Sequence, residues 1–364
     1  MSGFTAVDIS QLPKPDVIQQ ISFEDIYSEM RDQMNGLVPL TFDGAGKVDL
    51  QKAELITEDN GDQYYRVPAN SDAGMMYVDL ESDPAARQLQ IVAYREMLVR
   101  QRTNDASLAV MLAYAIDADL DQIAAQYGVS RFLLVAADPA NNIEAVYESN
   151  DDFRRRIQLS NEGYSTAGPE GAYVYHALSA DANVKDASAQ SPTFQLAQIT
   201  DVVRATLPEN AIVLIVKDDA GLADPMPGDV AVTVLSRVGN GTADNTILAN
   251  VDNKLNEDGI RPISDTVRDR SASVTEYTID ATLTTYAGPD SSLVIANATQ
   301  QCQNYVDENH KLGRDITLSG IYGALHRPGV HKVILNNFDT DIICNRSESA
   351  YCTAINIAHA GVGE

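Results

Sequence analysis

Apolar residues recur every three or four positions through the segment from residue 81 to residue 129. The later ones form two groups: Leu108, Met111, Leu112 and Ala115, then Leu120, Ile123, Ala124 and Tyr127. Such spacing places them along one side of an α-helix. Asp83 suits a helix cap, Pro84 the first turn, and Gly128 the position just beyond a helix end. The whole segment is therefore predicted to be helical.

The first part of this segment is apolar on more than one side. Its apolar residues spread around the helix axis: Leu89, Ile91, Val92, Tyr94 and Leu98. A helix that is apolar over a wide arc is buried on several sides, as in a bundle. A shorter helix is predicted before it, capped by Ser22 with Asp25 three positions on, and ending near Asn35 and Gly36.

The second half of the chain mixes helical and strand patterns without a regular βαβ order. Apolar and polar residues alternate from Tyr277 to Thr284, which predicts a strand with one buried face. Further strands are predicted at 211–216, 230–235, 330–335 and 353–358, and helices at 151–162, 169–180, 247–255, 295–305 and 318–325. The predicted fold class is α+β, with an N-terminal helical bundle segment followed by mixed α/β domains with mostly antiparallel sheets.

Pattern and composition divide the chain into five parts. A helical arm (1–36) precedes a small β-rich excursion (37–80), where Asp-Gly and Asn-Gly pairs separate short strand-like pieces. A helical segment (81–150) and a central α+β domain (151–270) follow. A second α+β domain (271–364) closes the chain.

The charge of the chain is strongly negative. There are 52 acidic and 26 basic residues, which gives a net charge of −26. Such a surface repels nucleic acid and anionic membranes, so neither is expected as a partner. The acidity fits either simple solubility or docking to a basic partner. No signal peptide or membrane span is expected, since the longest apolar run stops at Asp117.

The sequence contains few residues in patterns typical of catalytic, metal or cofactor sites. Its five histidines are scattered, and its three cysteines (Cys302, Cys344 and Cys352) follow no zinc spacing. The segment from Asp117 starts like a calcium loop but has Gln122 and Gly128 where that loop needs Gly and Glu. Gly239 and Gly241 indicate a tight turn rather than a dinucleotide site. No catalytic residue, metal site or cofactor is predicted.

One basic cluster stands out, formed by Arg154, Arg155 and Arg156. On a helix these side chains point in different directions, so at most one is expected on the core side with Phe153 and Ile157. Two interpretations remain open. The arginines either form ion pairs at the surface of an acidic protein, or they clamp an acidic neighbour.

Four segments together resemble the baseplate J-like family of contractile phage tails, and most closely its temperate coliphage version. Their most specific strings are AYRE (93–96), LAYAIDADLDQIAAQYGV (112–129), STAGPEGAYVYHALSA (165–180), RPISDTV (261–267) and LHRPGVHKV (325–333). The resemblance implies a structural protein of the virion tail baseplate that is made in the host cytoplasm during assembly. It implies no enzymatic activity.

The resemblance also implies partners. Helices of the 81–150 segment would join those of a second copy and of a tail-protein-I-like protein in a wedge-core bundle, through Leu89, Val92, Leu98, Met111 and Leu112. The 271–364 domain would contact neighbouring wedges and form an iris-like ring around the hub and spike, rearranging when sheath contraction is triggered. A lysozyme-like wedge or sheath-initiator protein is a further expected neighbour. Arg154, Arg155 and Arg156 are candidate interface residues as well.

The chain departs from the family pattern at two places, and two alternative functions remain open. Residues 193–226 lengthen the chain relative to the family pattern, as an inserted segment expected on the outside of the core, and residues 37–79 are also longer than usual. The same resemblance fits a wedge subunit of a tailocin or another contractile injection system. A muralytic tail enzyme is the alternative of a different class, although the chain has no Trp to build an aromatic sugar platform.

Overall fold

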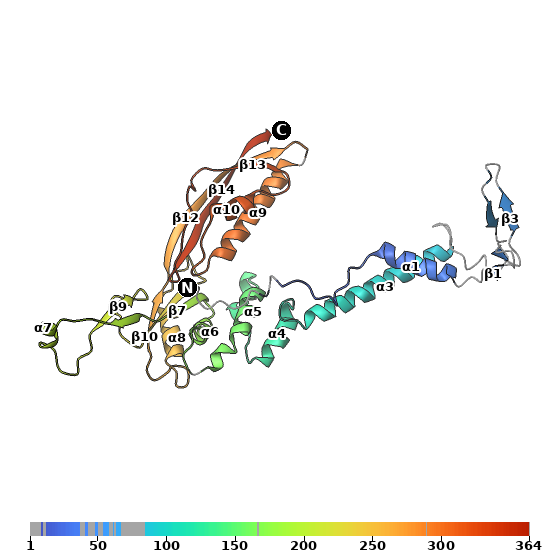
Figure 1. Ribbon diagram of the computed structural model, residues 1–364. Helices are drawn as coiled ribbons and strands as arrows, with labels where there is room; N and C mark the ends of the chain where they lie inside the picture. Colours follow the sequence, from blue (N-terminus) through green and yellow to red (C-terminus); the bar gives the residue numbers. More distant parts are fainter. Residues whose placement is uncertain are drawn as a thin grey trace. The chain divides into compact units, whose positions relative to one another are not determined.

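The computed structural model describes residues 9, 12–36, 41–42, 48–49, 54–57, 61, 63–66, 84–165, 167–288 and 290–363. These belong to two compact units, Asp8–Leu120 and Asp121–Glu364, and Figure 1 labels many of their helices and strands. The predicted cap Asp83 and most of the 37–80 excursion lie outside the described residues.

The N-terminal unit is built on two packed helices, α1 (Phe23–Gly36) and α3 (Pro84–Ala109). The Ser22 hydroxyl accepts the N–H of Asp25 at 3.3 Å, which confirms the predicted cap. Ile26 and Tyr27 of α1 pack against Ala93 of α3, and all three are buried. Two antiparallel strand pairs complete the unit: β1 (Thr41–Phe42) with β2 (Val48–Asp49), and β3 (Glu54–Thr57) with β4 (Gln63–Arg66).

The helical pattern is interrupted where none was predicted. Helix α3 ends at Ala109 and α4 (Asp117–Gln126) begins eight residues later, so residues 110–116 form turns. The Tyr114 hydroxyl donates to the Leu12 carbonyl at 2.8 Å and ties these turns to the N-terminal arm. The segment is therefore not helical at residues 110–116, although its sequence favours a helix, and this tertiary contact is formed there instead. Gly128, at φ +69°, follows α4 as predicted.

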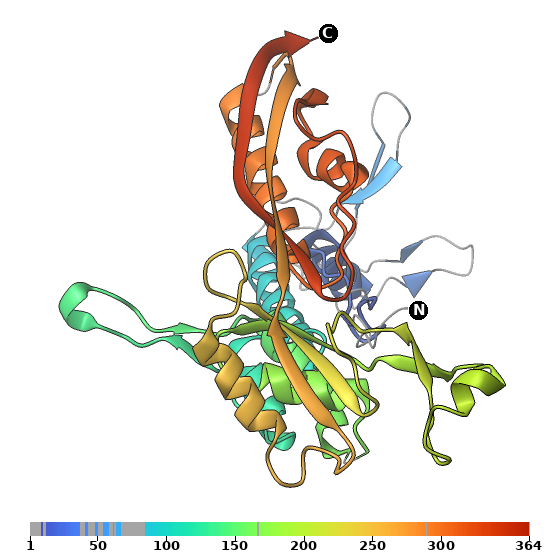
Figure 2. The same ribbon diagram turned by 90° about the vertical axis from the view of Figure 1, so that its left-hand side faces the viewer.

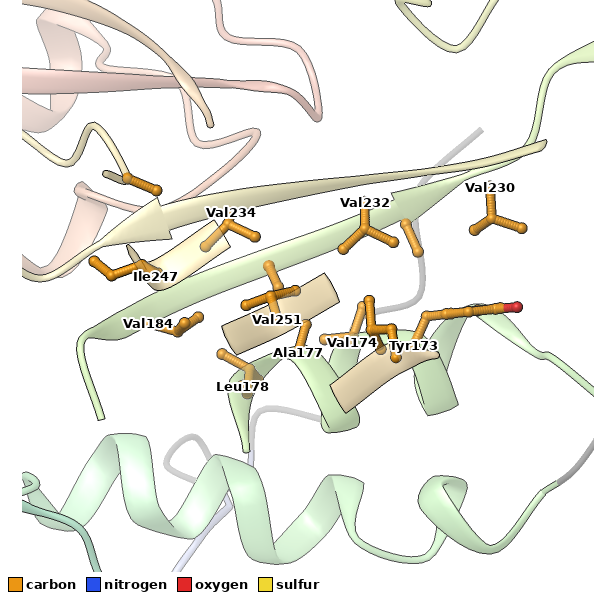
Figure 3. Close-up of a cluster of buried hydrophobic side chains, with 14 of the residues drawn as sticks. Tyr173, Val174, Ala177, Leu178, Val184, Val230, Val232, Val234, Ile247 and Val251 are labelled. Carbon is orange, nitrogen blue, oxygen red and sulfur yellow. The ribbon is translucent and has the colours of Figure 1, made fainter. Parts of the chain in front are cut away.

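The first core of the C-terminal unit contains the sheet β11-β10-β7. The central strand β10 pairs antiparallel with β7 and parallel with β11, and helix α8 makes the crossover between β10 and β11. Figure 3 shows Val230, Val232 and Val234 of β10 among apolar side chains of α6 and α8. The elements are β7 (Val184–Gln190), β10 (Asp229–Ser236), β11 (Thr266–Ser271), α5 (Asn150–Leu159), α6 (Glu170–Leu178) and α8 (Asn245–Leu255).

Two antiparallel ribbons belong to the same unit. One pairs β5 (Leu133–Val135) with β6 (Val146–Tyr147). The other pairs β8 (Thr193–Leu196) with β9 (Leu214–Asp218) and has the short helix α7 (Asp201–Arg204) at its tip. This second ribbon forms most of the 193–226 segment. Single-turn helices lie at Pro139–Asn141 and Glu162–Tyr164.

The second core of this unit contains the sheet β13-β12-β14 with two helices on one face. Ile279, Ala281 and Leu283 of β12 are buried and alternate with partly exposed polar residues, which confirms the predicted strand. The elements are β12 (Ser273–Tyr286), β13 (Val330–Leu335), β14 (Glu348–Gly363), α9 (Ser291–Asn309) and α10 (Leu318–Leu325).

The α+β class is confirmed by the mixture of helices and sheets. Most strand pairs in the described residues are antiparallel, as predicted, but each three-stranded sheet also contains one parallel pair. A parallel pair needs a long crossover, and here α8 supplies one and the whole of α9, α10 and β13 supplies the other. The five predicted domain bounds stay predictions.

Candidate functional site: assembly surfaces and an arginine cluster

Helix α3 is apolar on two sides, and α1 covers only one of them. The covered side carries the buried Ala86, Ala93 and Asn104, and Asn104 exchanges two hydrogen bonds with the Gln19 backbone, at 2.9 and 3.3 Å. The other side exposes large apolar side chains at helical spacing: Ile91, Val92, Tyr94, Leu98 and Val99. We call these five residues the outer stripe. Exposed large apolar side chains gathered on one side of a helix indicate a candidate binding surface.

The five predicted bundle residues do not share one surface. Val92 and Leu98 belong to the outer stripe and are 52% and 46% exposed. Leu89 lies on the covered side, packed against the α1 cluster. Met111 and Leu112 lie in the turns after α3 and are half-buried. The predicted set of bundle residues did not include Ile91, Tyr94 and Val99, because sequence spacing does not say which apolar side is already covered.

The arginine cluster is turned inward. Arg156 and Glu148 are 5% and 2% exposed and form a two-pronged ion pair, with Nε–Oε1 at 2.8 Å and Nη2–Oε2 at 2.7 Å. The guanidinium also donates to the Ser130 carbonyl at 2.7 Å and lies 4.0 Å from the centre of the Phe132 ring. Planar guanidinium groups pair with carboxylates and stack on aromatic rings in this way. Arg156 is therefore a structural element of the core.

The neighbouring arginines are paired within the chain as well. Arg154 binds Asp151 at 2.6 Å and Arg155 binds Asp186 at 2.7 Å. The charge of Asp186 raises the pKa of Arg155. The expectation that at most one arginine faces the core is wrong, since Arg154 is 8% exposed and Arg156 is 5% exposed. Buried charges are tolerated when they are paired, and here each arginine has a carboxylate partner.

The carboxylates of this cluster could not be found from the sequence. Asp186 lies 31 positions after Arg155, and Arg237 reaches Asp152 at 2.5 Å across 85 positions. In a chain with 52 acidic residues, no pattern singles out these partners. Two contacts are local: the Arg154–Asp151 ion pair, three positions apart, and the capping of α5, where the Ser149 hydroxyl accepts the N–H of Asp152 at 3.2 Å.

The described residues carry few groups suited to chemistry. They contain no group of three or more His, Cys, Asp or Glu side chains placed to hold a metal ion. Burial raises the pKa of the Cys302 thiol to about 12 and that of Cys344 to about 11, so both stay protonated. Across the same residues, no helix is long and apolar enough to span a membrane.

One buried histidine joins the two cores of the C-terminal unit. His310 is 8% exposed, and its Nδ1 lies 3.0 Å from the Lys185 Nζ. Because a lysine ammonium only donates, Nδ1 accepts and the neutral ring carries its proton on Nε2. Burial, followed by the charge of Lys185, lowers the pKa of His310 to about 4, against the opposing charges of Asp307 and Asp186.

Acidification is expected to destabilise the C-terminal unit through His310. Between pH 6.5 and about pH 4 the His310 imidazole is protonated in the unfolded chain but stays neutral in the folded chain. The free energy of unfolding therefore falls as the pH falls. The loss should approach ~3 kcal/mol at the lower end. Urea unfolding at several pH values would measure it, and His310→Gln should flatten the profile. The exposed His326→Gln is the control, and equal profiles for all three proteins would contradict the assignment.

Comparison with known proteins adds evidence at the level of the whole chain. Residues 81–138, which contain α3 and α4, match the family model described as the baseplate J-like N-terminal domain. The chain is also 36% identical over 360 residues to a protein of Escherichia phage P2 named baseplate protein J. That match covers 98% of this chain and 99% of the phage protein. It therefore extends over both compact units.

Proposed function

The chain belongs to the baseplate J-like family, and from this membership we propose that it is a structural subunit of the baseplate of a contractile phage tail. The observation that carries the proposal is the full-length match, because a shared single domain would not carry the role of a whole protein. The proposed location is the baseplate end of the virion tail, after synthesis in the host cytoplasm. The role requires binding surfaces rather than an active site.

The outer stripe of α3 supports a helical bundle as the first of these surfaces. Five large apolar side chains are exposed on one side of a helix whose other side is already packed. Helices of a second copy and of a tail-protein-I-like partner would cover them, because apolar stripes at helical spacing fit other helices. Val92 and Leu98 would lie within this wedge-core contact.

Strand β14 supports the ring contacts. It is an edge strand of the sheet β13-β12-β14 as described, and from Ser349 to Gly363 it has no Asp, Glu, Lys, Arg or Pro. Proteins protect solvent-exposed edges with such residues, and a long edge without them is a template for another strand. Pairing along β14 would join neighbouring wedges around the hub and spike. We place the lysozyme-like wedge protein among the neighbours without assigning it a surface.

The junction of the two cores supports a rearrangement when sheath contraction is triggered. The two apolar clusters share no residue, and β11 continues into β12 with only Ala272 between them. Several polar contacts cross the junction. The Asp186 carboxylate accepts the Leu312 N–H at 3.0 Å, and the Ser188 hydroxyl donates to the Arg346 carbonyl at 2.7 Å. Discrete polar contacts of this kind can be broken and re-formed when two packed bodies move against each other, which suits a hinge.

Labelling of intact tails tests the proposed function. Contractile tails purified from a lysate would be labelled with an antibody to this chain and imaged by negative-stain electron microscopy. Label confined to the baseplate end is the expected result. Unlabelled tails, with the chain free in the supernatant, would contradict a baseplate role.

Asp186→Asn is expected to loosen the junction between the two cores. The change weakens the charged hydrogen bond to the Leu312 N–H and the ion pair with Arg155. Hydrogen bonds to charged groups contribute about 1.5–3 kcal/mol, so exchange of the Leu312 amide should become roughly 10-fold to 100-fold faster. Hydrogen exchange followed by mass spectrometry over residues 310–316 would measure this.

Asp181→Asn is the matched control for this experiment. Asp181 accepts hydrogen bonds from the Asn183 N–H at 2.8 Å and from the Asn250 side chain at 2.6 Å, both within the first core. It should leave exchange over residues 310–316 unchanged. Equal exchange in the Asp186 variant and the wild type would show that Asp186 does not hold the two cores together.

A further inference from the structure

The ribbon of β8 and β9 has one wholly apolar face. Its cross-strand pairs are Phe194 with Val216 and Leu196 with Leu214. Residues opposite each other in an antiparallel pair point to the same side, so these four side chains form one surface. Leu196 is 73% exposed, and Leu214 and Val216 are exposed as well. We call these four residues the ribbon face.

The ribbon extends away from the sheet β11-β10-β7 and ends in α7 (Figures 1 and 2). Its tip continues the apolar character, since Val202 and Ile212 are 78% and 73% exposed. Among the described residues, β8 and β9 pair only with each other. A lone two-stranded ribbon is marginally stable in water, and an exposed apolar surface of this kind marks an interaction site.

The base of the ribbon is held firmly. Arg270 of β11 donates to the carbonyls of Gly221 and Ala220 and, at 2.9 Å, to the Thr233 hydroxyl. The Asp219 carboxylate accepts the Gly221 N–H at 2.7 Å. Ala220 is only 5% exposed. The core therefore fixes the stem of the ribbon, which is how a protein presents a preformed binding surface.

The charges around the ribbon face decide which partner it fits. Residues 193–226 contain five acidic residues but only two basic ones, Arg204 and Lys217. The Arg204 guanidinium already donates to the Ala211 carbonyl at 2.7 Å. A second copy would bring the same acidic groups together within the ~8 Å over which charges interact at physiological salt. A partner with basic side chains around an apolar centre would instead be attracted.

We propose that the ribbon face is a docking surface for a different protein of the particle, one whose contact surface is apolar at its centre and basic at its rim. The inference rests on the proposed baseplate role, because it places the partner in the tail. It differs from the bundle and ring contacts, which use α3 and β14. Binding covers Leu196 and Leu214 and stabilises a ribbon that the described part of its own unit leaves exposed.

Site-specific photo-crosslinking in assembled tails tests this docking surface. The photoreactive residue p-benzoylphenylalanine would replace Leu196 in one variant and Gln195, which points to the opposite side of the ribbon, in the control. Irradiated tails would be separated on denaturing gels, and the crosslinked peptides sequenced by mass spectrometry. The expected result is a crosslink from position 196 to one other protein species, at a peptide with Lys or Arg beside apolar residues, and at least fivefold less product from position 195.

Three results would overturn the inference. They are a crosslink to a second copy of this chain, equal products from both positions, and no product from position 196 in tails that contain the variant. Antibody labelling of the same tails separates these results from failure of the baseplate role, which would leave the tails without the chain. A crosslinked peptide that lacks basic residues would overturn the proposed chemistry of the partner.

Discussion

Leu98→Glu is expected to abolish association through α3 while the single chain stays folded. Leu98 is 46% exposed on the side of α3 that faces away from α1, so in the free chain the new carboxylate reaches water. In a bundle the same carboxylate would be buried without a partner, at a cost of several kcal/mol. Since each ~1.4 kcal/mol is a factor of ten in affinity, association should weaken by about 1000-fold or more.

Analytical ultracentrifugation of the chain with a tail-protein-I-like partner would measure this loss, and circular dichroism would check the fold. Leu293→Glu is the matched control, because Leu293 is 69% exposed on α9, outside the outer stripe. It should assemble like the wild type. Normal assembly of the Leu98 variant would mean that the outer stripe is not the bundle surface, and loss of helicity would mean that Leu98 supports α3 itself.

Local sequence patterns predicted the elements whose causes are local. The cap at Ser22, the alternation along β12 and the helix of Ile247, Val251 and Leu255 all depend on residues within a few positions of one another. The turn at Gly239 and Gly241 is local too, because both glycines adopt positive φ there, +65° and +103°. Such features follow from backbone geometry and side-chain spacing alone.

The sequence could not predict features that depend on distant partners. Both sides of α3 carry apolar residues at helical spacing, and that spacing alone does not show that α1 covers the side of Leu89 and leaves Leu98 exposed. The break before α4 is accompanied by a contact between Tyr114 and Leu12, which are 102 positions apart. The parallel pairing of β12 with β14 joins strands with two helices and β13 between them.

The ion pairs within the chain also bear on the charge of its surface. Basic side chains of the C-terminal unit are used for contacts within the chain, as Arg155, Arg156 and Arg237 show. These arginines are paired with carboxylates of the same chain, while many other acidic residues remain exposed. The acidic residues that give the chain its net charge of −26 therefore lie largely at the surface. A surface of this charge fits both solubility and docking to a basic partner, and the partner proposed for the ribbon face would use the second property.

Arg156→Met is expected to destabilise the C-terminal unit strongly. It leaves Glu148 buried at 2% exposure without its two-pronged partner and removes the guanidinium from the Phe132 ring. Breaking a buried ion pair from one side costs about 3–5 kcal/mol. Denaturant unfolding followed by fluorescence and circular dichroism would measure the free energy of unfolding. Lys254→Met removes a more exposed ion pair with Glu257 and should cost less than ~1 kcal/mol.

The double variant Arg156→Met with Glu148→Gln separates the two possible roles of this arginine. If Arg156 mainly neutralises Glu148, removing both charges should restore much of the stability. The cost of the single change comes from a buried carboxylate that keeps only a 4.0 Å contact with Arg237 and the hydrogen bond from the Phe132 N–H. If Arg156 instead clamped an acidic neighbour, both variants would keep wild-type stability as free chains and lose assembly. The burial of both groups favours the first result. If the Arg156 variant were as stable as the wild type, the arginine cluster would again be a candidate assembly surface.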